Sequence, residues 1–219
     1  TESVIQLATE KYQQHNLSTS RGYGVIMTTM TRERLLSEAE HLMREKGYSA
    51  FSYADLSKIV GITKASIHHH FPTKDILGEQ VVIQAFSDTQ RVFEQIEATE
   101  KSAEKRIAAY IDIFAQSHKA SLLPLCCALS AETANLPQAI TVQTSLYFDM
   151  QIEWLTKVVR AGMESGEFSS HAEPSDIALM IINVCEGSSV VAHATARPEV
   201  FTNSLKYIKL LHNTPHSGE

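Results

Sequence analysis

The strongest constraint on the fold lies between Tyr53 and Ile67, where two short apolar-patterned stretches meet at Gly61. Two helices joined by so tight a turn need a residue that readily takes a positive φ, and glycine does so without steric cost. The small Ser57 permits a close crossing of the two helices. The residues spaced to fill the wedge between them are Leu56, Val60, Ile62 and Ile67. The segment therefore predicts a helix-turn-helix.

Capping residues predict where these and the neighbouring helices begin and end. Ser52 and Asp55 form a capping-box pattern, and Thr63 and Thr73 stand before the next two helices. Gly47 is placed to end the preceding helix. That helix is expected from Thr31 onward, with an apolar stripe made of Leu35, Leu36, Ala39, Leu42 and Met43.

Apolar spacing stays helical along the rest of the chain, and no alternating period-2 stretch competes with it. Helices are expected at about 74–98, 102–119, 124–134, 137–165, 174–194 and 198–211. Pro124, Pro137, Pro174 and Pro198 each stand where a first helical turn tolerates a missing N–H. The predicted fold is all-α, with an N-terminal three-helix helix-turn-helix domain and a larger C-terminal helical domain.

The stretch from Gly47 to Leu77 resembles the N-terminal domain of TetR-family repressors. The resemblance rests on the glycine turn, on His70 followed by Phe71, and on the lysine that opens the next helix. It implies a dimeric DNA-binding repressor that a small-molecule or thiol-reactive effector releases from its operator. The DNA contacts that it implies are phosphate contacts from Ser52, Tyr53 and Lys74, and base or backbone contacts from Thr63, Lys64, Ala65, Ser66, His68 and His69.

One departure from the family pattern concerns His68, where tyrosine is usual. A histidine contact with DNA can depend on pH, because imidazole changes charge near neutrality.

The resemblance also divides the chain. Residues 1–26 show no clear apolar period and are expected to be a leader or flexible arm outside the fold. Residues 27–77 would form the DNA-binding domain, and residues 78–219 would bind the effector and form the dimer. The expected partners are double-stranded operator DNA, a second copy of the chain and a small-molecule effector, in the cytoplasm and without a cofactor or a membrane.

Charge is distributed unevenly along the chain, whose formal net charge is −6. Residues 32–74 hold seven Lys/Arg against five Asp/Glu, whereas residues 75–219 hold ten against eighteen. Local potential governs contact with phosphate, so the asymmetry favours one DNA-facing end and an acidic body.

The expected effector cavity combines an apolar wall with a few polar groups, drawn from Phe114, His118, Leu122, Leu125, Cys126, Cys127, Leu129, Tyr147, Met150 and Trp154. Ordinary core packing is the alternative for each of these residues. The adjacent thiols of Cys126 and Cys127 could react with electrophiles or oxidants if their pKa were lowered, and the alternative is that they are inert small apolar residues.

Two helices are expected to form the dimer surface. Helix 137–165 carries two apolar rows, so it must be covered on two sides. Helix 174–194 combines apolar residues with small ones, from Gly187 to Ser189, that permit close approach.

Two alternative functions are a helical enzyme and a helical adaptor that does not bind DNA. A di-metal enzyme would need Glu-x-x-His motifs on two facing helices, and the chain does not offer that pair. No Gly-rich phosphate loop or nucleophile elbow is present. The consecutive side chains of His68, His69 and His70 point about 100° apart on a helix, so they cannot converge on one metal ion. No catalytic residue or metal site is therefore expected.

Overall fold

The structure is a computed structural model that describes residues 23–168, 172–197, 199–201, 203 and 206. Within these residues every regular element is helical, and no strand occurs. The elements are α2 (Tyr23–Lys46), α3 (Tyr53–Val60), α4 (Lys64–His70), α5 (Lys74–Thr99), α6 (Ala103–Lys119), α7 (Leu125–Ser130), a 3₁₀ turn η1 (Thr133–Asn135), α8 (Gln138–Glu164) and α9 (Pro174–Thr195). The all-α prediction is confirmed.

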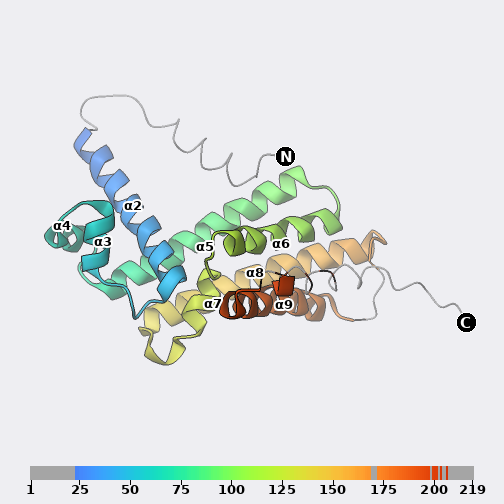
Figure 1. Cartoon of the computed structure of the whole chain (residues 1–219). Coiled ribbons are helices and arrows are strands. Elements are labelled where there is room, and N and C mark those ends of the chain that lie inside the picture. The colour runs from blue at the N-terminus through green and yellow to red at the C-terminus, as the bar shows by residue number, and fades with distance from the viewer. Residues whose placement is uncertain (1–22, 169–171, 198, 202, 204–205, 207–219) are drawn as a thin grey trace, which may run out of the picture.

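The helices form two groups that α5 joins (Figure 1). The first helices, α2, α3 and α4, lie together at one end of the molecule. From there α5 runs away towards the other end, where it lies alongside α6 and α8, and α9 packs against α6 and α8. The small group therefore stands at the end of an elongated helical body.

Two helices differ from their predicted ranges. The first begins at Tyr23 instead of near Thr31, so it enters the segment 1–26 that was expected to lie outside the fold. The expected helix 124–134 ends at Ser130, where a turn leads into η1. Most of the expected helix 198–211 lies outside the described residues.

The turn between α3 and α4 has the predicted geometry. Gly61 has φ +76° and ψ +28°, and its N–H donates to the carbonyl of Ser57 at 3.0 Å. The Ser57 hydroxyl in turn donates to the carbonyl of Ile62 at 2.6 Å, which holds the turn from inside. The capping box of Ser52 and Asp55 is complete, and Thr63 and Thr73 accept hydrogen bonds from backbone N–H groups of α4 and α5.

A substitution at Gly61 tests this turn. A Cβ added there would meet nothing within 4 Å, so the cost of Gly61→Ala should come from the positive φ alone. We expect the free energy of unfolding to fall by about 1–2 kcal/mol in chemical denaturation. Gly61→Asn is the matched control and should lose less, because asparagine adopts the left-handed conformation more readily. If the alanine variant were as stable as the natural chain, residue 61 would not have the positive φ that disfavours alanine.

The apolar core consists of two clusters. The first cluster lies under the helix-turn-helix and includes Leu56, Ile67 and Phe71, but Leu129 and Ile140 from the body also belong to it. The second cluster fills the space between α5, α6, α8 and α9. Because the first cluster takes side chains from the helix-turn-helix and from the body, the helix-turn-helix is packed directly onto the body.

Polar contacts fix the helix-turn-helix on its supporting helices. Arg34 on α2 donates to the carbonyl of Ile59 at 3.2 Å, and the Tyr53 hydroxyl donates to the carbonyl of Phe71 at 2.8 Å. The first contact ties α3 to α2, and the second ties the start of α3 to the end of α4. Helix α3 is therefore held both to α2 and to the end of α4.

Helix α9 is long and apolar enough, by length and composition, to be compared with a membrane span. In this fold it packs against α6 and α8, and it contributes Ala178, Ile181 and Cys185 to the second core cluster. A core helix of a helical bundle passes the same test, so its composition carries little information about a membrane.

Candidate nucleic-acid interface and effector cavity

The outer face of α4 and the residue that caps it form an exposed surface. All six residues that were predicted to contact bases or backbone are exposed. They are Thr63, Lys64, Ala65, Ser66, His68 and His69. Ile67 points the other way and is fully buried. Short and basic side chains on an exposed recognition helix can enter a major groove.

Two of the predicted phosphate contacts have hydroxyls that are engaged within the protein. Ser52 donates to the Asp55 carboxylate at 2.9 Å as part of the capping box. Tyr53 is half-buried and its hydroxyl donates to the carbonyl of Phe71, and burial raises its pKa to about 12. Both residues therefore hold the helix ends in place, and a phosphate contact from either hydroxyl would require its present hydrogen bond to be exchanged.

Lys74 lies at the start of α5, packed on two aromatic rings. Its Nζ is 4.5 Å from the ring centroids of both Tyr48 and Phe51, and it donates to the carbonyl of Ser49 at 3.3 Å. Burial lowers the pKa of Lys74, and nearby carboxylates, of which Glu132 is the strongest, act against that effect. The ammonium keeps two further hydrogens, and it stands where the first N–H groups of α5 also favour an anion.

His68 is held in one orientation. Its Nδ1 is 3.0 Å from the carbonyl of Pro72, and its ring lies 4.8 Å from the Tyr53 ring. Since a carbonyl only accepts, Nδ1 must carry the hydrogen, which leaves Nε2 as an acceptor in the neutral ring and a donor in the protonated ring. A contact between Nε2 and a phosphate therefore needs the protonated form.

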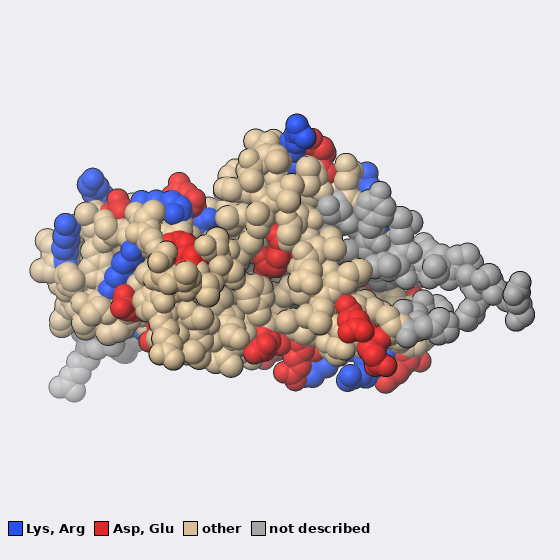
Figure 2. Space-filling model, turned by 90° about the horizontal axis from the view of Figure 1, so that it is seen from below, with Lys and Arg blue, Asp and Glu red and all other residues tan. Residues whose placement is uncertain are grey.

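Basic side chains gather at the helix-turn-helix end of the molecule, on the left of Figure 2. Acidic side chains prevail along the edge of the opposite end of the same view. The surface thus follows the charge asymmetry of the sequence, and the end that carries α4 is the one suited to a polyanion.

A cavity of about 260 Å³ lies between α2 and the helices of the body. It takes residues from α2, α5, α6, α7, α8 and α9 and from the loop before α7. The lining residues are Glu40, Arg44, Ala85, Asp88, Thr89, Tyr110, Ile113, Phe114, Ser117, Pro124, Leu125, Cys126, Tyr147, Gln151 and Glu186. A cavity with apolar walls and a few convergent polar groups is the usual form of a small-molecule site.

The structure brings together four of the residues predicted for this cavity, which are Phe114, Leu125, Cys126 and Tyr147. Six others do not line it: His118, Leu122, Cys127, Leu129, Met150 and Trp154.

Three of these six residues lie outside the cavity lining because they pack elsewhere, which the sequence pattern does not reveal. Trp154 stacks on Phe93 at a centroid distance of 4.2 Å and donates from Nε1 to Glu97 at 2.8 Å. Leu129 is fully buried in the first core cluster, and His118 stacks on Phe201.

The other three are likewise absent from the cavity lining. Met150 packs against the second core cluster. The Cys127 thiol hydrogen-bonds the Glu186 carboxyl, and Leu122 is half-buried in the loop before α7.

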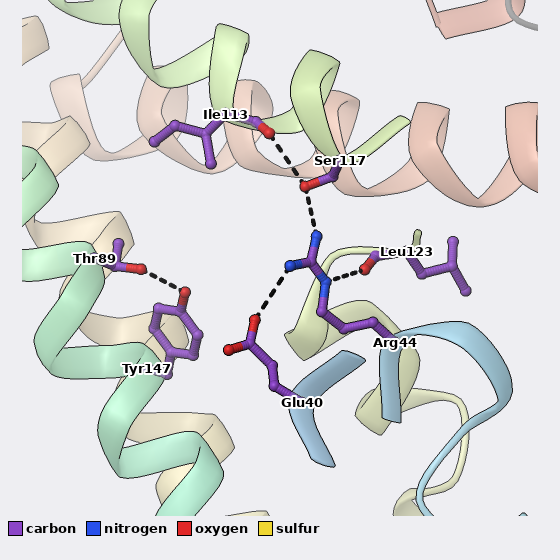
Figure 3. A network of polar contacts seen from close by, with 7 residues as sticks. All are labelled: Glu40, Arg44, Thr89, Ile113, Ser117, Leu123 and Tyr147. Carbon is purple, nitrogen blue, oxygen red and sulfur yellow. Dashed lines mark hydrogen bonds and ion pairs between the residues drawn. The ribbon is translucent and has the colours of Figure 1, made fainter. Parts of the chain in front are cut away.

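Sequence reasoning missed Arg44, which reaches from α2 to the body (Figure 3). Its guanidinium donates to the Ser117 hydroxyl at 2.7 Å, to the carbonyl of Leu123 at 2.9 Å and to the Glu40 carboxylate at 3.1 Å. Arg44 and Glu40 sit four residues apart on α2, a spacing that predicts an ion pair but not its partners across the molecule. The helix that supports the helix-turn-helix therefore forms one wall of the cavity.

A second contact joins the body to the helix-turn-helix. The Glu132 carboxylate, between α7 and η1, accepts from the N–H of Ser49 at 2.9 Å. Gly47 has φ +87°, and a Cβ there would collide with the same carboxylate. Glu132 therefore fits against the loop that follows α2, only a few residues from the cavity residues on α7.

Sequence reasoning also missed Glu186, an acid of α9 that reaches the cavity. Its Oε2 is buried and has no hydrogen-bond partner among the described residues. Burial raises the pKa of Glu186 from its ordinary 4.5 to about 7, and the hydrogen bond from Cys127 acts in the opposite direction. The Glu186 carboxyl in the cavity wall therefore changes protonation near neutral pH.

This pKa has a consequence for stability. Between pH 4.5 and about 7 the folded chain binds more protons at Glu186 than the unfolded chain does, so stability should fall as pH rises through this window. We expect the difference in unfolding free energy between the natural chain and Glu186→Gln to change by about 2–3 kcal/mol from pH 4.5 to pH 8, in favour of the variant at high pH. Denaturation at a series of pH values measures it, and a constant difference would contradict the raised pKa.

The two adjacent cysteines are in surroundings that disfavour the thiolate. Burial raises the pKa of Cys126 well above its usual range and that of Cys127 to about 12, and the nearby Glu186 carboxyl adds to both effects. Since the thiolate is the reactive form, the surroundings of these cysteines give no support to a thiol-reactive release mechanism.

Thiol labelling checks this point. We expect N-ethylmaleimide to modify Cys126 and Cys127 in the folded chain at least about 100-fold more slowly than a free thiol at pH 7. Mass spectrometry of the timed reaction gives the rate, and the unfolded chain is the control. Labelling as fast as in the unfolded chain would contradict the assignment.

Comparison with known proteins agrees with this geometry. Residues 35–81 match the family model described as bacterial regulatory proteins, tetR family, and this range covers α2 from Leu35, the whole helix-turn-helix and the start of α5. This segment is similar to the DNA-binding region of TetR-family regulators.

Relatives extend the similarity beyond the helix-turn-helix. It is 25% identical over 190 residues to the HTH-type transcriptional repressor NemR of Escherichia coli K12, which covers 84% of this chain and 95% of NemR. It is 23% identical over 161 residues to the HTH-type transcriptional repressor DhaR of Mycobacterium sp. GP1, covering 73% of this chain and 81% of DhaR.

The fold of this chain is also similar to that of solved structures. A TetR-family regulator from Agrobacterium tumefaciens superposes with a TM-score of 0.81 at 25% identity, over 85% of this chain and 100% of that one. The similarity includes the helical body that holds the cavity, so the whole arrangement belongs to the family fold.

Proposed function

We propose that this chain is a homodimeric transcriptional repressor that binds operator DNA through α4 and releases it when a small molecule occupies the cavity. The observation that carries the proposal is the exposed, short and basic face of α4 from Lys64 to His69, at the basic end of the molecule. Lys74 stands beside this face at the positive end of α5. Phosphate contacts would orient the helix, and the groups on α4 would read the bases.

This placement divides the two binding roles between two regions of the chain. Residues 27–77 bind DNA, residues 78–219 bind the effector and a second copy, and the chain works in the cytoplasm, where operator DNA is found. The names of NemR and DhaR, both transcriptional repressors, support repression as the outcome.

The dimer surface is argued from apolar side chains that a single copy leaves in water. On α8 these are Val142 and Leu146, and on α9 they are Leu179, Val190 and Val191, each between 41% and 49% exposed. The exposed face of α9 also contains Gly187, where an added Cβ would meet nothing within 4 Å. Apolar residues with a small residue between them suit close packing of helices, and two helices from each copy would form a four-helix interface.

Effector control is supported by the way α2 connects the two regions. Arg44 on α2 lines the cavity, while the same helix holds α3 through the contact between Arg34 and Ile59. A ligand that displaces the guanidinium from Ser117 or Leu123 would shift α2, and α4 would move with it. Spacing between the two recognition helices of a dimer must match one helical turn of DNA, so a small shift is enough to weaken binding.

Footprinting of the DNA upstream of the chain's own coding region tests the proposal. We expect protection of a short, near-palindromic site from DNase I, with two half-sites about one helical turn apart. An unrelated duplex of equal length is the control. Absence of protection on every fragment tested, with folded protein present, would refute operator binding by this chain.

A further inference from the structure

The charges that face the cavity are unbalanced. Among the described residues that line it, Glu40, Asp88 and Glu186 bring three carboxyl groups, and Arg44 brings the one guanidinium. Glu40 pairs with Arg44 and Asp88 pairs with Arg91, so Glu186 is the lining carboxyl with no ion pair among the described residues. An ionised Glu186 would repel an anionic ligand, and a cationic ligand would compensate its charge. The electrostatics of the cavity therefore favour a cation.

Arg44 is not available to receive an anion in any case. All three of its guanidinium nitrogens already donate, to Ser117, Leu123 and Glu40 at 2.7–3.1 Å. An anion would have to compete with two neutral acceptors and one carboxylate for the same donors. The guanidinium of Arg44 thus has a structural role.

Glu186, unlike Arg44, has a polar atom that is still unpaired in the part of the chain that the structure describes. One of its carboxyl oxygens, Oε2, is buried without a hydrogen-bond partner among the described residues. A buried polar atom left unpaired costs free energy, which a ligand with an N–H group can recover. The unpaired oxygen marks the position in the cavity where a donor is missing.

The remaining walls suit the apolar part of such a ligand. Tyr110, Phe114 and Tyr147 line the cavity together with aliphatic residues from α6 and α7. Aromatic faces attract cations as well as apolar groups. A volume of about 260 Å³ is below the usual range for drug-sized ligands, so the occupant must be small.

We propose that the effector is a small amine, protonated at neutral pH, whose ammonium group donates to Oε2 of Glu186 while its apolar part packs against the aromatic walls. This inference rests on the proposed function, because it names the ligand class of the same cavity. Charge-assisted hydrogen bonds of this kind are among the stronger ones in proteins.

Binding should release a proton. Below pH 7 the Glu186 carboxyl holds a hydrogen, and an arriving ammonium ion takes its place, so that the carboxylic acid becomes a carboxylate and one H⁺ passes to the solvent. The nearest ionisable groups around this carboxyl are Cys126 and Cys127 from α7, Tyr110 from α6 and Cys185 on α9 itself. The charged groups across the cavity are Glu40 and Arg44 on α2 and Asp88 on α5. The pKa values of these three thiols and of Tyr110 are raised by burial, so none of them ionises in this range.

Calorimetry with three matched probes tests the ligand class: 2-phenylethylamine as the cation, 2-phenylethanol as the neutral analogue and 3-phenylpropanoate as the anion. On the full chain we expect the amine to bind at least about 10-fold more tightly than the alcohol at pH 8. Amine affinity should rise about 10-fold from pH 6 to pH 8. Equal affinity of amine and alcohol, tighter binding of the carboxylate, or no measurable binding of the amine at millimolar concentration would each overturn the proposal.

Glu186→Gln should abolish both the preference for the amine and its pH dependence. Glu94→Gln, the same change at an exposed position of α5, is the control and should alter neither. Retention of the preference in Glu186→Gln would overturn the proposal. Calorimetry of the unchanged chain at pH 6 in two buffers of different ionisation enthalpy does not depend on how the variant folds. It should give close to one proton released per amine bound, and no release would also overturn it.

These measurements contain no DNA, so they test the ligand site alone. Operator binding of the unchanged chain is measured separately. Amine binding by a chain that ignores DNA would refute the proposed repressor and leave the amine site standing, whereas operator binding without amine binding would refute only the ligand class.

Discussion

Lys64→Glu is expected to weaken operator binding about 100-fold or more while leaving stability almost unchanged. Lys64 is exposed at the start of α4, and none of the hydrogen bonds or ion pairs in the described structure involves its side chain. The substitution places a carboxylate where DNA presents phosphates, and a dimer carries it twice. Fluorescence anisotropy with labelled operator measures the affinity, and thermal denaturation measures the stability.

Two controls make this result specific. Lys101→Glu makes the same charge change at an exposed site between α5 and α6, away from the helix-turn-helix, and should lower affinity only slightly. Lys74→Glu should weaken binding too, but it also removes an ammonium that lies 4.5 Å from each of two aromatic rings, so a loss of stability accompanies it. Equal loss of affinity in Lys64→Glu and Lys101→Glu would mean that overall charge, and not α4, determines binding.

Breaking the dimer is expected to have an effect of similar size by a different route. Val190 and Val191 are 42% and 47% exposed on α9, and aspartate at both positions would place charges inside the proposed four-helix interface. We expect the double variant to be a folded monomer in light scattering at micromolar concentration. Its operator affinity should fall by at least about 100-fold, because one subunit reaches only one half-site.

Ile59→Asp is the matched control for the oligomeric state. Ile59 is 42% exposed on α3, at the other end of the molecule, so its replacement introduces the same chemistry away from α8 and α9. This control should remain a dimer. A double variant at Val190 and Val191 that is still dimeric would show that the copies meet through another surface.

The helix-turn-helix could be predicted residue by residue because its signals are local. Gly61 has the positive φ that its turn requires, and Ser52, Thr63 and Thr73 cap the helices that follow them. Each of these residues acts on backbone groups only a few positions away. The exposed face of α4 follows from the same short-range pattern, since Ile67 alone in that helix is fully buried.

The cavity could be predicted only in part, because its residues meet through tertiary packing. Arg44 and Glu186 are far apart in the sequence, and nothing near either one indicates that both face the same space. Within α7, Leu125 lines the cavity whereas Leu129, one turn later, is sealed in the core. Cys126 and Cys127 also face different surroundings, which adjacency in the sequence could not reveal.

The early start of α2 at Tyr23 was missed for a related reason. Residues 23–30 lack the regular apolar spacing that marks a helix packed on a core, so the sequence gives no periodic signal there. A helix can extend beyond its packed part, and its additional turns then depend on propensity alone. Periodicity therefore finds the buried part of a helix more reliably than its ends.

The central claim is that the exposed face of α4 binds operator DNA, and a salt titration of operator binding tests it most directly. Anisotropy should show tight binding of the upstream DNA at low salt, a linear rise of log Kd with log salt, and a shallower slope for Lys64→Glu than for Lys101→Glu. An unrelated duplex should bind at least about 1,000-fold more weakly. Failure of the folded dimer to bind any duplex at low ionic strength, or identical slopes for the two variants, would contradict the account.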